Sequence, residues 1–232
     1  MAIALATRMR SGGRSVALVD ADDVTPSIAQ RLGLPLHPNL RSAAEAIVHD
    51  SDPPERCVIE HSSGIGVVGG LSRPADRRGL RSSDVMSVLR SMTGRFAVVV
   101  ANVSAQIGDR ESQYTEATLS RTVIEAAHTV VLVGVASPVG MSRIAEWLGA
   151  AQLGEAKTGL HLVLNRFPGG RYRSAEIVDE LLRFARPRSA TVIPFDRRVQ
   201  RAEWRGVSVA RGPFHRAARR VVSHIDEPQT IA

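Results

Sequence analysis

The chain has 232 residues, enough to bury one sizeable core, and 44% of them are hydrophobic although only 4% are aromatic. It carries a formal net charge of +7, and no apolar run approaches the roughly 18–20 residues that span a bilayer, so we expect neither a transmembrane helix nor a secretory signal peptide. A single cysteine, Cys57, excludes an internal disulfide, fits a half-buried strand residue, and predicts a cytoplasmic location.

The first half of the chain alternates helices and strands. Thr25-Pro26-Ser27 begins a helix that Gly33 ends, and Ser83-Asp84 begins another that Gly94 ends. The apolar run FAVVV is typical of a buried strand. In chain order, we predict helix 2–10, strand 15–19, helix 25–32, helix 40–48, strands 57–60 and 65–68, helix 83–92 and strand 96–100.

The second half continues the alternation after a polar, irregular segment at 102–115. We predict helix 116–127, strand 129–135, helix 139–153, strand 160–164, helix 174–186, strand 190–193 and a last helix at 214–225. This pattern predicts an α/β fold of three layers, with a mostly parallel sheet and helices on both faces. We expect one domain over residues 1–232, with a disordered tail at 226–232, because no linker or repeat divides the chain.

Polar residues follow several of the predicted strands. In an open parallel sheet, ligands bind beyond the carboxyl ends of the strands. The candidate site residues are therefore Asp20 and Asp22, then Ala101 and Asn102, then residues 136–138, then Asn165 and Arg166, and then Pro194 to Asp196. Asp22 and Asp23 could instead cap the next helix, and Asn165 could simply form a turn at the end of its strand.

Five of these segments, in order, resemble motifs of the MinD/ParA family of deviant P-loop ATPases, which includes CpaE-like pilus-assembly proteins. They are GGRSVALVDADDVTPSIAQRLGL, FAVVVANVS, AAHTVVLVGVASPVGMSRIAEWL, LHLVLNRFP and TVIPFDRRVQRAEWRGVSVARGPF. The likeness covers roughly residues 2–222 and points towards the actinobacterial branch of the family.

The resemblance implies ATP and Mg²⁺ as cofactors and assigns roles to the strand-end residues. Asp20 and Asp22 would be the catalytic acids, with Asp22 an indirect ligand of Mg²⁺, an ion that prefers oxygen ligands. The resemblance also implies that Asn165, with Arg166, Pro194 and Asp196, would bind the nucleotide, Asn165 through the adenine.

Two parts of the family's ATP site have no counterpart here. The phosphate loop needs a G-x-x-x-x-G-K-[ST] segment, but MAIALATRMRSGGR resembles only the helix after it, and Lys157 is the only lysine. Ala101 stands where the family has its second acid, the aspartate at the end of the Walker B strand.

Either the natural start lies upstream, or the protein is a pseudo-ATPase. An upstream start would restore the phosphate loop, whereas the departure at Ala101 holds under both alternatives, and for the chain as it stands we expect poor or no hydrolysis. Without its first strand, the sheet should also expose unpaired apolar edges.

The resemblance implies a positioning or assembly protein of septum placement, chromosome partitioning or pilus and secretion machinery. The alternative is a non-catalytic scaffold that dimerises through the same face. We expect a homodimer with a protein partner from such machinery. The scattered arginines leave nonspecific DNA or an anionic membrane surface as weaker alternatives. The last helix could lie on a membrane, although packing on the sheet explains its apolar stripe better.

Overall fold

The computed structural model describes residues 1–107, 118–151, 159–169, 174–183 and 186–226. These residues form two compact units. The N-terminal unit comprises residues 2–126 and 202–208, and the C-terminal unit comprises residues 1, 127–201 and 209–232. Each unit has a sheet of its own and is described by itself.

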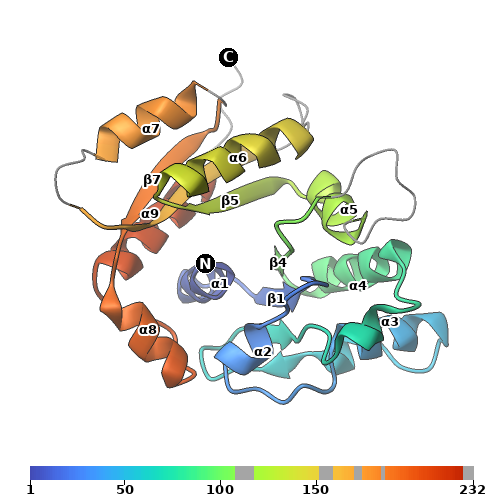
Figure 1. Cartoon of the computed structure of the whole chain (residues 1–232). Coiled ribbons are helices and arrows are strands. Elements are labelled where there is room, and N and C mark those ends of the chain that lie inside the picture. Colours follow the sequence, from blue (N-terminus) through green and yellow to red (C-terminus); the bar gives the residue numbers. More distant parts are fainter. Residues whose placement is uncertain (108–117, 152–158, 170–173, 184–185, 227–232) are drawn as a thin grey trace. The chain divides into compact units, whose positions relative to one another are not determined.

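The N-terminal unit contains a four-stranded sheet in the order β2-β3-β1-β4. β1 pairs in parallel with β3 and β4, whereas β2 and β3 are antiparallel. The strands are β1 (Val16–Asp20), β2 (Ile59–Glu60), β3 (Gly66–Val68) and β4 (Val98–Asn102). The helices are α1 (Ala2–Ser11), α2 (Ile28–Arg31), α3 (Leu40–Val48), α4 (Ser82–Arg95) and α5 (Thr118–Ala126), with short 3₁₀ helices η1 (Pro54–Cys57) and η2 (Pro74–Arg77) (Figure 1).

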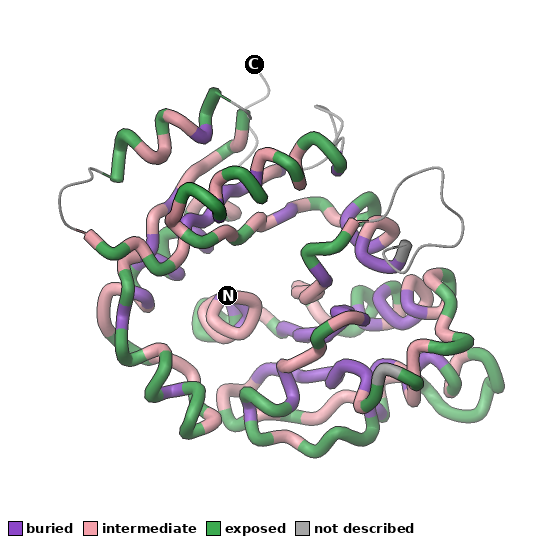
Figure 2. Tube along the Cα trace, in the orientation of Figure 1, coloured by how far each residue is buried: buried purple, intermediate pink, exposed green. Residues whose placement is uncertain are grey.

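β1 forms the centre of this unit because its side chains are apolar on both faces, apart from its last residue. All five of its residues are buried, as the purple segment in Figure 2 shows. Ala17 and Val19 pack in one cluster with residues of α3, α4 and α5. Val16 and Leu18 point to the opposite face, since side chains alternate along a strand, and α1 contacts β1 and β4. Helices therefore supply the core with apolar side chains from several directions.

The C-terminal unit contains a fully parallel sheet in the order β5-β6-β7. Its elements are β5 (Thr129–Val135), α6 (Pro138–Ala151), β6 (Gly159–Phe167), α7 (Ser174–Leu182), β7 (Ser189–Pro194) and α9 (Pro213–Asp226), and α8 (Arg197–Trp204) belongs to it as far as Arg201. Ile144 of α6 and Leu181 of α7 pack on Leu162 and Leu164 of β6. α9 contacts β7 and β6 through five buried apolar residues. The predicted packing of the last helix on the sheet is thus confirmed.

The predicted α/β fold with helices around a mostly parallel sheet is confirmed, with β2 the antiparallel exception. The assignment of one domain to residues 1–232 stays a prediction. Within the predicted tail, residue 226 ends α9, whereas 227–232 lie outside the described residues. Most of the irregular segment at 102–115 and Lys157 lie outside them as well.

Some local predictions were wrong. Cys57 is buried rather than half-buried, and it ends η1 rather than lying in a strand. Gly94 lies inside α4 instead of ending it, since the helix continues to Arg95. β4 begins two residues later than predicted because the Ser15 carbonyl and hydroxyl accept the N–H groups of Val98 (3.1 Å) and Ala97 (2.9 Å). α8 was not predicted.

Two edge strands have the composition of central strands. Within the described residues, β4 pairs only with β1, and β5 pairs only with β6. All residues of β4 are half-buried, and Val133 and Val135 of β5 are 39% and 47% exposed. Natural edge strands are usually protected by charge, proline or bulges, and neither strand carries a charged residue or a proline. Both strands therefore have apolar edges without the usual protection.

Candidate functional site

The acid at the end of β1 is bound to the neighbouring strand. Asp20 and Asn102 are the last residues of β1 and β4, and they lie opposite each other in the parallel register. The Asn102 side-chain amide donates a hydrogen bond of 2.9 Å to Oδ1 of Asp20. The residue that follows Ala101 thus supplies a neutral donor to the carboxylate.

The second oxygen of Asp20 caps α2. Its Oδ2 accepts the backbone N–H groups of Ser27 (2.8 Å) and Ile28 (2.9 Å), seven and eight residues further along the chain. Ser27 itself provides no side-chain cap. The Asp20 residue is fully buried, and this desolvation raises the pKa of its carboxyl despite the opposing hydrogen bonds from Asn102, Ile28 and Ser27. The predicted helix cap is therefore present, but Asp20 provides it rather than Asp22 or Asp23.

The backbone at Gly70 lies close to the Asp20 carboxylate. A Cβ atom at Gly70 would lie 2.4 Å from Cβ of Pro26 and 3.0 Å from Oδ2 of Asp20. Only glycine allows this approach without a shift of the neighbouring backbone or of the buried carboxylate. The carboxylate is consequently enclosed by its donors and by the chain after β3.

Asp22 and Asp23 both bind groups of the protein itself. Oδ1 of Asp22 accepts the N–H groups of Val24 (3.0 Å) and Thr25 (2.8 Å), and Oδ2 accepts the Thr25 hydroxyl (3.3 Å). This is an Asx-type turn. Asp23 forms an ion pair of 2.9 Å with Arg77, and its side chain is only 3% exposed. The turn that carries these two acids, which we call the acidic turn, is therefore stabilised by its own hydrogen bonds and by the ion pair to η2.

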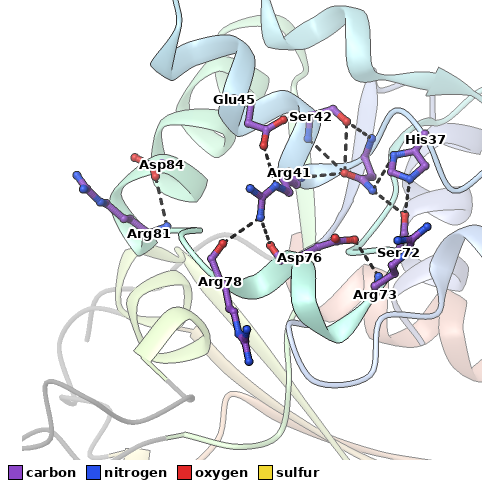
Figure 3. A network of polar contacts seen from close by, with 11 residues as sticks. His37, Arg41, Ser42, Glu45, Ser72, Arg73, Asp76, Arg78, Arg81 and Asp84 are labelled. Carbon is purple, nitrogen blue, oxygen red and sulfur yellow. Dashed lines mark hydrogen bonds and ion pairs between the residues drawn. The ribbon is translucent and has the colours of Figure 1, made fainter.

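A polar network fixes the segment that carries Arg77 (Figure 3). From α3, the Arg41 guanidinium donates to the carbonyl oxygens of Asp76 (2.7 Å) and Arg78 (3.0 Å) and to Glu45 (2.7 Å). The carboxylate of Asp76 accepts the backbone N–H of Arg73 (2.9 Å). Because η2 is anchored to α3 in this way, it presents Arg77 to the acidic turn in one fixed place.

These acids do not fit a Mg²⁺ site as they are arranged. Mg²⁺ requires oxygen ligands with free lone pairs and usually keeps several waters. Both oxygens of Asp20 accept N–H donors and the residue is buried, while both oxygens of Asp22 accept donors from their own turn. Ala101 and Asn102 provide no carboxylate. Across the described residues, no group of three or more His, Cys, Asp or Glu side chains could hold a metal.

The nucleotide-binding candidates at the end of β6 lie on a distorted stretch of backbone. The register with β7 shifts between Leu164 and Phe167, so Asn165 and Arg166 form a bulge. Arg166 has a φ of 59°, a left-handed conformation that is uncommon outside glycine. Oδ1 of Asn165 accepts the Arg166 N–H (2.9 Å), and its carbonyl accepts the N–H of Ala136 after β5 (2.8 Å). Asn165 is thus half-buried in a bulge inside β6, which continues to Phe167, and not in the strand-end turn given as the alternative.

Pro194 ends β7, and Asp196 follows it as a buried cap. The Asp196 carboxylate accepts the N–H groups of Arg198 (3.0 Å) and Phe214 (3.3 Å) and the Arg198 guanidinium (3.3 Å). Burial opposes its charge, but these donors and the positive charge of Arg198 prevail and lower the pKa of the carboxyl. Asp196 therefore joins the first turns of α8 and α9.

The predicted strand ends fall into two groups. Asp20 meets Asn102 in the N-terminal unit, while in the C-terminal unit Ala136 follows β5, Asn165 lies in the bulge of β6 and Pro194 ends β7. Convergence of all five ends on one crevice stays a prediction. Asn102 is recognisable from the sequence as a strand-end residue, but its bond to Asp20 is not, because that bond depends on the strand register.

No family model and no curated protein sequence matches the chain. Solved structures do. A ParA family ATPase from Chlorobium tepidum is similar with a TM-score of 0.77 and 16% identity, over 97% of this chain and 91% of that one. The septum site-determining protein MinD of Pyrococcus horikoshii, complexed with Mg-ADP, has a TM-score of 0.77 and 14% identity, over 97% and 89%.

MinD in a MinC:MinD cell division complex from Aquifex aeolicus is also similar. The TM-score is 0.72 and the identity 13%, over 100% of this chain and 91% of that one. At such low identity these likenesses show the fold alone, since one fold supports many functions. The chain therefore has the MinD/ParA-like fold that the strand-end motifs predict.

Proposed function

We propose that this protein is a MinD/ParA-like positioning or assembly protein with a degraded ATP site that hydrolyses ATP poorly or not at all. Septum placement, chromosome partitioning and pilus or secretion assembly are the processes that the motifs favour, in a bacterium of the actinobacterial branch. The fold supports the general class. The hydrogen bond between Asn102 and Asp20 is the main observation that supports the loss of ATP hydrolysis.

The loss of turnover follows from how Asp20 is bound. A catalytic acid in such a site must contact the metal, its water shell or the attacking water. Asp20 instead uses both oxygens to cap α2 and to bind the Asn102 amide. Loss of one electrostatic contact of this kind costs about 2.7–4 kcal/mol of transition-state stabilisation in well-studied enzymes. With Ala101 in place of the second acid, we expect hydrolysis at the background rate.

Nucleotide binding without turnover is a separate part of the proposal. Asn165 carries an amide on a bulge beside the end of β5, and the distortion at Arg166 is typical of functional positions. If this chain binds ATP, Asn165 would contact the adenine, with Arg166 and Pro194 beside it. Asp196 would act by fixing α8 and α9, because its carboxylate is occupied by their N–H groups.

A non-catalytic scaffold is the alternative, and the arrangement of Asp20 favours it over a nucleotide-driven switch. The scaffold would dimerise and bind its partner regardless of nucleotide, whereas a switch would require ATP for both. The MinD of Aquifex aeolicus is found in a complex with MinC, which supports a protein partner for this chain as well. We propose a cytoplasmic homodimer that binds a component of the division, partitioning or pilus machinery.

Phosphate release and molecular mass together test this function. The purified full chain is incubated with ATP and Mg²⁺, using an active ATPase as a positive control, and its mass is measured by light scattering with and without nucleotide. We expect no release above background and a mass of twice 25.0 kDa in both conditions. ATP-dependent dimerisation would support the switch, and protein-dependent hydrolysis that Asp20→Asn abolishes would refute the degraded site.

A further inference from the structure

Three exposed arginines lie on the short segment that connects β3 to α4. Arg73 directly precedes η2, Arg78 directly follows it, and Arg81 directly precedes α4. All three belong to the N-terminal unit, so one compact body carries them. We call these three residues the η2 arginines.

The acids beside the η2 arginines bind backbone groups instead of the guanidinium groups. The Asp76 carboxylate accepts the backbone N–H of Arg73 (2.9 Å), and the Asp84 carboxylate accepts the backbone N–H of Arg81 (3.3 Å). Among the residues that the structure describes, no ion pair includes an η2 arginine. Three positive charges are therefore left for a partner.

The backbone that carries the η2 arginines is held in place from two sides. Arg41 of α3 donates to the carbonyl oxygens of Asp76 (2.7 Å) and Arg78 (3.0 Å). On the other side, Arg77 forms its ion pair with Asp23 of the acidic turn. A surface whose backbone is fixed in advance loses less conformational entropy when a partner binds. This arrangement favours recognition by the η2 arginines.

The η2 arginines do not converge on one point. In Figure 3, the side chains of Arg78 and Arg81 leave the polar network in different directions. A single phosphate or sulfate ion would need several donors aimed at the same place. Separate guanidinium groups instead suit carboxylates spaced along a chain, because each planar guanidinium can bind one carboxylate at two points.

An exposed apolar side chain lies at one end of this segment. Leu36 is 40% exposed, and its carbonyl accepts the hydroxyl of Ser72 (2.9 Å), the residue before Arg73. The ring of His37 is also close to that hydroxyl, with 3.2 Å between Nε2 and Oγ. A partner that combines carboxylates with an apolar side chain could contact both features at once.

We propose that the η2 arginines and Leu36 bind an acidic segment of a partner protein. Clusters of arginine are a recurring means of recognising acidic motifs, and arginine is enriched among the residues that contribute most to protein interfaces. The inference rests on the proposed function for the existence of a protein partner. It adds the chemistry of the contact and the surface that makes it.

Duplex DNA and anionic membranes fit this surface less well. Both present a dense and continuous negative charge. The carboxylates of Glu45, Asp76 and Asp84 lie among the arginines (Figure 3), and such a continuous charge would be repelled by them. A protein segment can place each of its carboxylates beside a guanidinium and leave the neighbouring acids uncontacted, which is the complementarity that protein interfaces use.

This contact requires neither nucleotide nor hydrolysis. Failure of an acidic peptide to bind would overturn the inference and leave the degraded ATP site as proposed. Conversely, ATP hydrolysis by the chain would refute the degraded site and leave the η2 arginines as a binding surface. The two proposals can therefore fail separately.

Fluorescence anisotropy of a labelled peptide with the purified full chain tests the inference. The probe is a fluorescein-labelled peptide of glutamate and glycine with leucine at one end. One variant carries Arg73→Ala, Arg78→Ala and Arg81→Ala, and a control of equal charge carries arginine-to-alanine changes at the exposed α9 positions 216, 219 and 220. With circular dichroism unchanged, we expect roughly 10-fold weaker binding for the η2 variant and nearly unchanged binding for the control.

Two further variants separate recognition of carboxylates from general charge. Replacing the three η2 arginines by lysine keeps the charge but removes two-point binding, so the affinity for the peptide should fall. Leu36→Ser should weaken binding only of the peptide that carries leucine. Equal losses for the η2 and α9 alanine variants, or full binding by the lysine variant, would overturn the proposal. Binding of duplex DNA or phosphatidylglycerol vesicles without binding of the peptide would overturn it as well.

Discussion

The side-chain amide of Asn102 donates a hydrogen bond of 2.9 Å to the buried carboxylate of Asp20, and this bond joins the carboxyl ends of two neighbouring parallel strands. The same carboxylate caps α2 through two backbone N–H groups. Asp20 thus ties a strand, a helix and a second strand together. A carboxylate with this structural role is poorly suited to hold a hydrated metal ion.

Replacing Asn102 by aspartate should destabilise the protein at neutral pH. Two carboxylates would then face each other across a hydrogen-bond distance in a buried place, so both cannot be ionised. We expect Asn102→Asp to lower the free energy of unfolding by about 1–3 kcal/mol at pH 7, and by less as the pH falls and the pair takes up a proton. Urea denaturation at several pH values measures this.

Asn165→Asp is the matched control, because Asn165 is also a strand asparagine, close to the carboxyl end of β6, but is only half-buried. Its Oδ1 accepts the Arg166 N–H, a role that a carboxylate keeps. We expect its effect to stay within about 0.5 kcal/mol. A loss as large as that of Asn102→Asp would mean that the bond to Asp20 has no special importance.

Asp20 should make stability fall as the pH rises. Its folded-state pKa lies above the ordinary value of 3.8, so the folded protein binds this proton more tightly than the unfolded chain. The associated stabilisation is fully present below 3.8 and is lost as the pH rises through the raised folded pKa. The difference in unfolding free energy between wild type and Asp20→Asn should therefore decrease with pH. A difference that increases over this window would refute the raised pKa.

Asp196 should give the opposite pH dependence. Its folded-state pKa is lowered below 3.8 by the donors from Arg198 and Phe214, which outweigh its burial. Its stabilisation is present above 3.8 and is lost as the pH falls through the lowered folded pKa. Asp196→Asn should remove this acid-sensitive part of the stability, as measured by urea denaturation from neutral to acidic pH. Parallel curves for variant and wild type would contradict it.

The closeness of Gly70 to the carboxylate of Asp20 predicts a steric cost. Gly70→Ala would place a Cβ 2.4 Å from Pro26, and we expect it to destabilise the protein by about 1–3 kcal/mol. Gly94→Ala is the control, since a Cβ there meets nothing within 4 Å and Gly94 lies inside α4. The control should stabilise by about 0.5–1 kcal/mol. Similar thermal midpoints for the two variants would show that the chain around Gly70 adjusts freely.

Strong periodic patterns predicted some elements to the residue. The helix 40–48 and the strand 129–135 have the predicted bounds, because an amphipathic repeat and a continuous apolar run mark them. α8 was missed because RRVQRAEW is polar on most of its surface, and its beginning depends on Asp196. The start of β4 was misplaced because Ser15, not the apolar run, determines where pairing begins.

The residues of the candidate site could be predicted from the sequence, but the hydrogen bonds between them could not. The predicted strand ends made Asp20 and Asn165 candidates, because ligands bind beyond the carboxyl ends of strands in an open parallel sheet. The pairing of Asp20 with Asn102 requires the register of two strands that lie 82 residues apart in sequence. The helix cap was assigned to Asp22 and Asp23 because they are nearer in sequence, yet Asp20 reaches the N–H groups of α2.

Binding of Mn²⁺ as a substitute for Mg²⁺ tests the central claim most directly. The electron paramagnetic resonance signal of Mn²⁺ with ATP is recorded while the purified wild-type chain is added, and the titration is repeated with Asp20→Asn. Because the carboxylate of Asp20 is occupied by its three N–H donors, we expect the same signal with either protein. A protein-dependent loss of signal that Asp20→Asn abolishes would contradict this account, since it would mean that Asp20 holds the metal.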